Sequence, residues 1–321
     1  MEYEFSIGSV RAREKRLLSS SDIEQMLALK SEKELVRFLK DKAFGDGETV
    51  DELISSNTEI MWKYVKSVAP DMNLFEPFFI QNDVHNLKTV LKGTMSDRDY
   101  DNLLITPCMT DEKTLVWAVE NRRFDKLPEW LGNAADTAYG LLAETKDARL
   151  SDAVIDKAVM QKLISESKKI KSAFLRKYIE RLVFFAEVKI ALRAAKTSAT
   201  ETYLEQALCE CDGLDIQTLI RTTLSGEKEL IKYLEKIDIH DCKKAVELYK
   251  KSPSEFEKFV DDGTMKIARE LCRYANIGPE PLLGYCMGCE FDRKTVNIIS
   301  GGIKTKTPPD KIRERLRVSY G

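Results

Sequence analysis

Three copies of one short apolar pattern constrain the fold of this chain more than any other feature. The pattern reads Leu-x-x-aromatic-Leu or a close variant, and it occupies residues 35–39, 127–131 and 230–234. Residues three and four apart share a helix face, so each copy is predicted to be the buried stripe of the same short helix. The residues concerned are Leu35, Phe38, Leu39, Leu127, Trp130, Leu131, Leu230, Tyr233 and Leu234.

The second and third copies belong to a longer collinear repeat. The matching pairs, each offset by 103 or 104 residues, are Asp83 with Glu187, Val84 with Val188, Lys92 with Lys196, Tyr100 with Tyr203, and Asp111 with Asp215. A further acidic helix start stands at Glu290, again 103 residues after Glu187. Internal repeats of this kind indicate one structural unit used several times. Asp83, Glu187 and Glu290 are therefore predicted to be equivalent anchors.

The repeats predict the domain organisation. Residues 50–148 and 149–240 would form the first two helical units. Each end of the chain lacks what the other supplies, so residues 1–49 and 241–321 would together complete a third unit. Three similar units, the last of them closed by the first, predict a funnel or ring with pseudo-three-fold symmetry and with the chain termini close together.

Helical periodicity dominates the sequence and predicts an all-α fold. Apolar residues follow a helical rhythm from Val50 to Val68. Hydroxyl residues followed three positions later by glutamate predict helix starts at Ser21, Ser31, Thr49 and Ser252. Glycine or proline predicts helix ends at Gly45, Pro70, Gly93, Gly132 and Gly278. A weak extended segment is expected only at residues 298–306.

Composition narrows the class of protein. Hydrophobic residues make up 43% of the chain, and charged residues make up 32%, against about 25% in an average protein. With 51 Lys and Arg against 53 Asp and Glu, the chain has no dominant basic surface, so nucleic acid is not an expected partner. No apolar run approaches the roughly 20 residues of a membrane span, and the first residues do not read as a secretory signal. Seven unpatterned cysteines suit a reducing compartment, so a cytoplasmic location is expected.

The sequence offers no convincing catalytic, cofactor or metal site. Cys286 and Cys289 form a single CxxC, whereas a structural zinc site needs about four ligands, so buried thiols are the favoured interpretation. The two histidines, His85 and His240, have no nearby ligand set. Neither a phosphate-binding GxxxxGK[ST] nor a GxGxxG motif occurs. We therefore expect a non-enzymatic chain without a cofactor.

Several stretches resemble one family, the C subunits of V/A-type ATPases, which are relatives of the d subunit of eukaryotic V-ATPases. They are SVRAREKRLLSSSDIEQML with FLKDKAFG near the start, SDAVIDKAVMQKL with FFAEVKIALRAAK in the middle, and PEPLLGYCMGCEFDRKTVNIISGGIKTKTPPDKIRERLRVSYG at the end. The resemblance spans the whole chain. It implies a funnel-shaped, non-catalytic part of the central stalk, located on the cytoplasmic face of the membrane.

The resemblance also implies partners. These are the D and F subunits of the central shaft and the membrane rotor ring, with the stator membrane subunit as a further candidate. Basic residues on related helices are candidates for the partner-binding surface, although solvated outer faces would show the same pattern: Arg11, Arg13, Lys88, Lys92, Lys189, Arg193, Lys196, Arg293 and Lys294. The sequence leaves open whether protons or sodium ions are coupled, and whether ATP is mainly made or hydrolysed.

Two other classes of function compete with this one. A helical-repeat adaptor for an unrelated protein is the alternative, but such repeats usually run over 34 to 47 residues and are open-ended. An all-α enzyme ranks third, because it would need a convergent acidic or nucleophilic cluster that the sequence does not offer.

Overall fold

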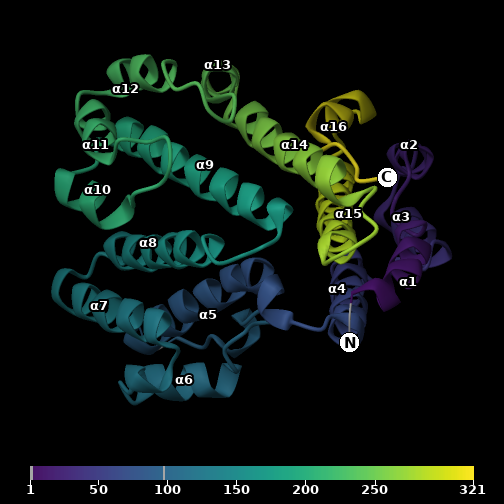
Figure 1. The fold of residues 1–321 in the computed structure, drawn as a ribbon, viewed down its shortest axis with the longest axis horizontal. Helices are drawn as coiled ribbons and strands as arrows, with labels where there is room; N and C mark the ends of the chain where they lie inside the picture. The colour runs from purple at the N-terminus through teal and green to yellow at the C-terminus, as the bar shows by residue number, and fades with distance from the viewer. Residues whose placement is uncertain (1–2, 97) are drawn as a thin grey trace. The chain divides into compact units, whose positions relative to one another are not determined.

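A computed structural model describes residues 3–96 and 98–321 (Figure 1). Within these residues the chain forms sixteen α-helices and three short 3-10 helices, and no β-strand is found among them. The all-α prediction is confirmed. The chain divides into two compact units: unit 1 comprises Met1–Met72, Ser172–Phe174 and Glu247–Gly321, and unit 2 comprises Asn73–Lys171 and Leu175–Val246.

Unit 1 is built around the longest helix of its C-terminal part, α15. Its helices are α1 (Glu4–Glu14), α2 (Ser20–Leu27), α3 (Glu32–Asp41), α4 (Val50–Val68), α14 (Pro253–Cys272), α15 (Glu280–Lys304) and α16 (Pro309–Arg315). α15 contacts all six of the others, and in Figure 1 it runs beside α14 and α4. Since most of its residues are buried, α15 forms the centre of this unit.

The core of unit 1 joins segments from the two ends of the chain. Leu18, Leu35 and Leu53 lie in the same buried cluster as Val296 and Ile312. The backbone N–H of Leu18 also donates a hydrogen bond of 3.0 Å to Oδ2 of Asp292 on α15. The N-terminal helices of this unit therefore depend on residues that are more than 270 positions away in the sequence.

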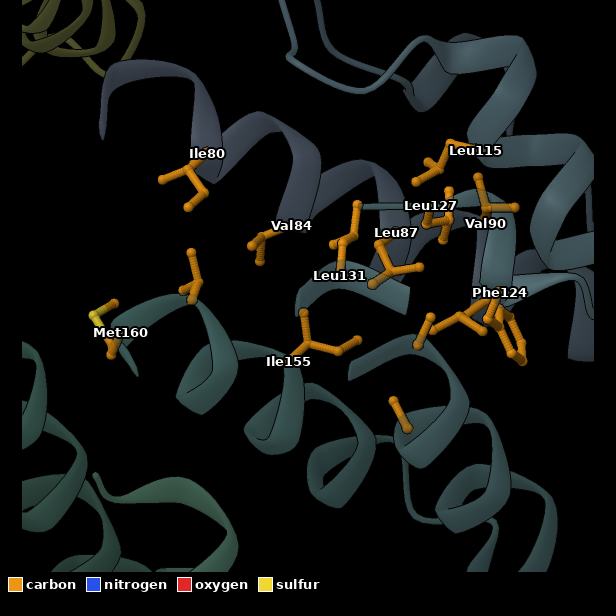
Figure 2. Close-up of a cluster of buried hydrophobic side chains, with 14 of the residues drawn as sticks. Ile80, Val84, Leu87, Val90, Leu115, Phe124, Leu127, Leu131, Ile155 and Met160 are labelled. Atoms are coloured by element: carbon orange, nitrogen blue, oxygen red, sulfur yellow. The ribbon is translucent and has the colours of Figure 1, made fainter. Parts of the chain in front are cut away.

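Unit 2 contains the middle of the chain. Its helices are η1 (Met72–Phe75), α5 (Glu76–Ser96), η2 (Asp101–Leu103), α6 (Glu112–Glu120), η3 (Phe124–Lys126), α7 (Glu129–Thr145), α8 (Ala148–Ser167), most of α9 (Ala173–Thr197), α10 (Glu201–Ala207), α11 (Ile216–Leu224), α12 (Glu227–Leu234) and the first half of α13 (Cys242–Lys251). Figure 2 shows its main core, in which Leu87 of α5, Leu115 of α6, Leu131 of α7 and Ile155 of α8 face one another. Within this unit, α8 packs against α5, α7 and α10.

Most predicted helix starts are confirmed, with one correction. Ser31, Thr49 and Ser252 are N-caps whose hydroxyls accept a backbone N–H. α4 runs from Val50 to Val68 as predicted. The start predicted at Ser21 is wrong, because Ser19 is the N-cap of α2 and forms a capping box with Asp22.

Two predicted helix ends are wrong for a common physical reason. α5 continues through Gly93, and Gly132 lies inside α7. A Cβ at Gly93 would collide with the ring of Tyr100, and one at Gly132 with the carbonyl oxygen of Phe124. These glycines permit close packing instead of ending a helix. The extended segment expected at 298–306 is also wrong, because α15 continues to Lys304.

The three apolar pentapeptides share one burial pattern but not one helix type. In each copy both leucines are buried, while Phe38, Trp130 and Tyr233 are half-buried. The first and third copies lie within the short helices α3 and α12. The second was predicted on a similar short helix, which is wrong: Leu127 precedes Pro128, the N-cap of the long helix α7. The division into three units and the pseudo-three-fold symmetry stay predictions.

Candidate partner-binding surfaces

A buried carboxylate on α5 fixes the chain ahead of α6. Asp83 is 2% exposed, and its two oxygens accept the backbone N–H groups of Met109 at 3.0 Å and Thr110 at 2.7 Å. Thr110 immediately precedes Asp111, the N-cap of α6. Asp83 therefore sets the position at which the next helix begins.

Glu187 on α9 performs a similar task in the second half of unit 2. It is fully buried and accepts the backbone N–H of Cys209 at 3.1 Å and its thiol at 3.2 Å. Burial raises the pKa of Glu187 to about 7, while the two bonds from Cys209 oppose the rise. The match between Asp83 and Glu187 thus has a structural counterpart, since both carboxylates hold a loop between helices.

In unit 1 the corresponding contact is made by Asp292. This side chain is 5% exposed and accepts the N–H of Leu18, which precedes the N-cap of α2 just as Thr110 precedes that of α6. Burial raises the pKa of Asp292 to about 8. The sequence repeat missed Asp292, because its constant offset pointed to Glu290, two residues earlier. Glu290 pairs instead with Arg293, at 2.5 Å.

The segment between α5 and α6 combines firm anchoring with exposed apolar side chains. Asn86 donates to the carbonyl of Ile105 and accepts its N–H, at 2.9 and 2.8 Å, and Asn82 donates to the carbonyl of Pro107. Leu103, Ile105 and Met109 are nevertheless 58%, 39% and 46% exposed. Polar side chains of α5 therefore hold this segment by hydrogen bonds, while the apolar side chains of the segment itself are exposed.

Most candidate basic residues of unit 2 are occupied by ion pairs. Lys88 contacts Asp156 at 2.5 Å, and Lys92 contacts Asp152 at 2.7 Å, so both lysines fasten α5 to α8. Lys196 lies 3.4 Å from Glu227. Lys189 is half-buried on α9. Arg193, also on α9, is exposed and lines a cavity at the ends of α8 and α9.

The candidates in unit 1 are likewise engaged in internal contacts. The side chain of Arg11 binds Glu14 and the carbonyl oxygens of Cys272 and Ala275. The Arg13 guanidinium carbon lies 3.9 Å from the centre of the Tyr64 ring. Arg293 is buried and donates to Asn57 at 3.0 Å. Lys294 pairs with Asp261 at 2.7 Å.

The paired cysteines of α15 and His240 all lie in packed surroundings. Cys286 and Cys289 are buried in α15, and burial raises the pKa of both thiols. His240 is packed against Phe184, and burial lowers the pKa of its ring.

Within residues 3–96 and 98–321, no group of three or more His, Cys, Asp or Glu side chains is arranged to hold a metal ion. Nor does any helix of this described part combine the length and the apolar character that crossing a bilayer requires.

Comparison with known proteins identifies the class. The family model described as ATP synthase (C/AC39) subunit matches residues 6–315, and the chain belongs to this family. It is therefore a helical subunit of an ATPase complex, and other subunits of such a complex are its partners.

A particular relative agrees with this class. The chain is 18% identical to the C subunit of the V-type sodium ATPase of Enterococcus hirae over 326 residues, which cover 100% of this chain and 99% of that protein. The resemblance to the C subunits of V/A-type ATPases is confirmed.

Proposed function

We propose that this chain is the non-catalytic central-stalk subunit that links the shaft of a V/A-type ATPase, formed by the D and F subunits, to the membrane rotor ring. It would transmit torque between ATP hydrolysis or synthesis and the transport of protons or sodium ions. It would lie at the cytoplasmic face of the membrane. The stator membrane subunit is a further candidate partner.

The observation that carries this proposal is the extent of the family match. The match runs from residue 6 to residue 315 and therefore covers all of unit 2 and most of unit 1. The relative from Enterococcus hirae is matched over nearly its whole length as well. A chain that matches over nearly its full length is expected to have the same role as full-length members of the family. We propose that this role is to connect the shaft to the ring.

Contacts within the chain favour the proposed role of a rigid connecting subunit. A rotor component has to resist distortion, and buried carboxylates that hold loops, such as Asp83 and Asp292, restrict local movement. Ion pairs such as Lys92 with Asp152 add cross-links between helices. We propose further that three related units form a funnel which receives the shaft, with residues 50–148, 149–240 and the joined ends as the units.

The proposal is tested by assembly. This chain is co-expressed with the D and F subunits from the same source, and the products are analysed by native mass spectrometry. An equimolar complex of the three chains is the expected result. The D and F subunits expressed without this chain are the control, and they should give only their own pair.

A second arm examines the ring contact. Membranes that contain the rotor ring but have been stripped of peripheral proteins are incubated with the purified chain and then sedimented. Retention on these membranes, and not on protein-free vesicles of the same lipids, is expected. A folded chain that bound neither the shaft nor the ring would contradict the proposal and favour the unrelated adaptor.

A further inference from the structure

Unit 2 contains a cavity of about 370 Å³ where α8 begins, α9 ends and α10 begins. Its charged lining residues are Arg149 and Arg193, together with Asp147. Asp147 is already engaged, because it accepts from Nε and Nη2 of Arg149 and from the Arg149 backbone N–H. Its charge is thus paired with Arg149, and it forms no ion pair with Arg193.

Arg193 is the uncommitted cation of this cavity. It is exposed on α9, and among the residues that the structure describes its guanidinium group has neither an ion pair nor a hydrogen bond. This separates it from Lys88, Lys92 and Lys196, whose charges are compensated by carboxylates. An arginine fork without a partner is suited to bind a carboxylate through two parallel hydrogen bonds.

The neutral polar groups of the cavity are also hydrogen-bond donors. Thr200 uses its hydroxyl oxygen to accept the N–H of Tyr203, which leaves the hydroxyl hydrogen available. No hydrogen bond from the Ser198 hydroxyl or the Tyr203 phenol is found within the described part of the chain. Burial, followed by the charge of Asp156, raises the pKa of Tyr203, so its phenol stays protonated. The residues that line the cavity thus offer several donors, and the carboxylate among them, Asp147, is paired with Arg149.

We propose that this cavity binds an acidic side chain from a peptide segment of a neighbouring subunit, with Arg193 as the residue that pairs with its carboxylate. The identity of the segment's source rests on the proposed function. The chemical class of the ligand rests on the lining alone, because a lining rich in hydrogen-bond donors favours a ligand that accepts hydrogen bonds.

The apolar part of the lining favours a peptide side chain over a free anion. Leu150, Ala194 and Ala199 line the same cavity as the two arginines. The methylene groups of a glutamate or aspartate side chain can contact these residues while the carboxylate reaches Arg193. Inorganic phosphate carries the charge but has no apolar portion, so it would leave these side chains without a contact.

The test uses the purified full chain and a fluorescein-labelled polyglutamate peptide, with fluorescence anisotropy as the readout. Arg193→Gln should weaken binding about tenfold or more, the size expected from a charge-assisted bidentate contact. Arg176→Gln is the matched control, because Arg176 lies exposed on the same helix and does not line the cavity. It should leave the affinity unchanged.

The remaining arms separate the ligand sources. A labelled polyglutamine peptide should not bind, and inorganic phosphate should compete with polyglutamate only weakly. If phosphate displaced the peptide completely at equal concentration, the site would be one for free anions and the proposal would be overturned. Equal weakening by Arg193→Gln and Arg176→Gln would overturn it too, since general charge attraction would then explain binding.

Failure here can be told apart from failure of the proposed function. A wild-type chain that assembles with D and F but ignores polyglutamate refutes the site and leaves the stalk role intact. A chain that binds polyglutamate through Arg193 but joins neither shaft nor ring keeps the acidic-peptide site and refutes the stalk role.

Discussion

At the scale of single residues, buried carboxylates are the features with the clearest physical consequence. Asp83, Glu187 and Asp292 each accept a backbone N–H from a loop, which satisfies a donor that would otherwise be buried without a partner. Leaving such a group unpaired costs about 1–3 kcal/mol. Two of the three also have raised pKa values, so their contribution depends on pH.

The first prediction concerns Glu187. Its pKa is raised by burial from its ordinary 4.5 to about 7. Between these values the folded chain holds a proton that the unfolded chain has lost, so the free energy of unfolding falls as the pH rises from about 4.5 to 7. We expect Glu187→Gln to reduce the loss of stability between pH 5 and pH 8 by roughly 3 kcal/mol at most. Urea unfolding at both pH values measures this.

The comparison cancels any packing defect of the glutamine, because that defect is present at both pH values. Glu180→Gln is the control, since Glu180 is exposed on the same helix. It should leave the pH dependence as it is in the wild type. An unchanged pH dependence in Glu187→Gln would show that Glu187 is already ionised throughout this range.

At the scale of elements, the segment between α5 and α6 shows how a loop whose one regular element is the short helix η2 is held. Asn86 pairs with both backbone groups of Ile105, as a neighbouring β-strand would. The repeat in the sequence placed Asp83 on a helix but did not predict this role of Asn86, because the pairing requires Asn86 and Ile105 to meet across 19 residues. Gly93 was misjudged for a related reason, since the contact with Tyr100 that requires a glycine is not visible in local sequence.

The second prediction follows from this loop. Asn86→Ala removes both bonds to Ile105, and we expect the amides of residues 103–110 to exchange with solvent about tenfold faster or more, because the local opening costs less free energy. Hydrogen–deuterium exchange with mass spectrometry measures the change. Gln81→Ala, an exposed position of α5, should have no such effect. Uniformly faster exchange across unit 2 would instead indicate a general loss of stability.

At the scale of the whole molecule, unit 1 is closed by a residue near the end of the chain. Tyr320 is 3% exposed, and its side chain fills space left by Gly284 and Gly288 on α15. Arg269 on α14 donates to the carbonyl oxygens of Tyr320 and Gly321. The segment after α16 is therefore part of the core and not a loose extension.

The third prediction tests that closure. Tyr320→Ala leaves a cavity against α15, and we expect it to lower the free energy of unfolding of unit 1 by about 3 kcal/mol. Exchange of the α14 and α15 amides at equilibrium reports this loss directly. Val318→Ala, at a position that is 40% exposed, should change it little. If the α14 and α15 amides of Tyr320→Ala exchanged at the wild-type rate, the segment after α16 would contribute little to the stability of unit 1.

The sequence predicted the class of the fold more fully than it predicted the surfaces. Helical rhythm predicted the all-α class and the bounds of α4, because both depend on neighbouring residues. The third unit made of both chain ends stays a prediction, and the repeat could not locate the bond between Leu18 and Asp292, which are 274 positions apart. The basic residues could not be sorted in this way, since the partners of Lys88 and Lys92 lie 68 and 60 positions away.

The make-up of unit 1 has a consequence for how the protein is made. Because synthesis proceeds from the N-terminus, the residues of unit 2 are made before α15, so unit 2 can begin to fold during translation. Helices α1 to α4 must wait, because α15 supplies the surface that covers them. Until then their apolar faces stay exposed to chaperones and proteases. A chain interrupted before α15 lacks a large part of the core of unit 1, so we expect that only completed chains are incorporated into the larger complex.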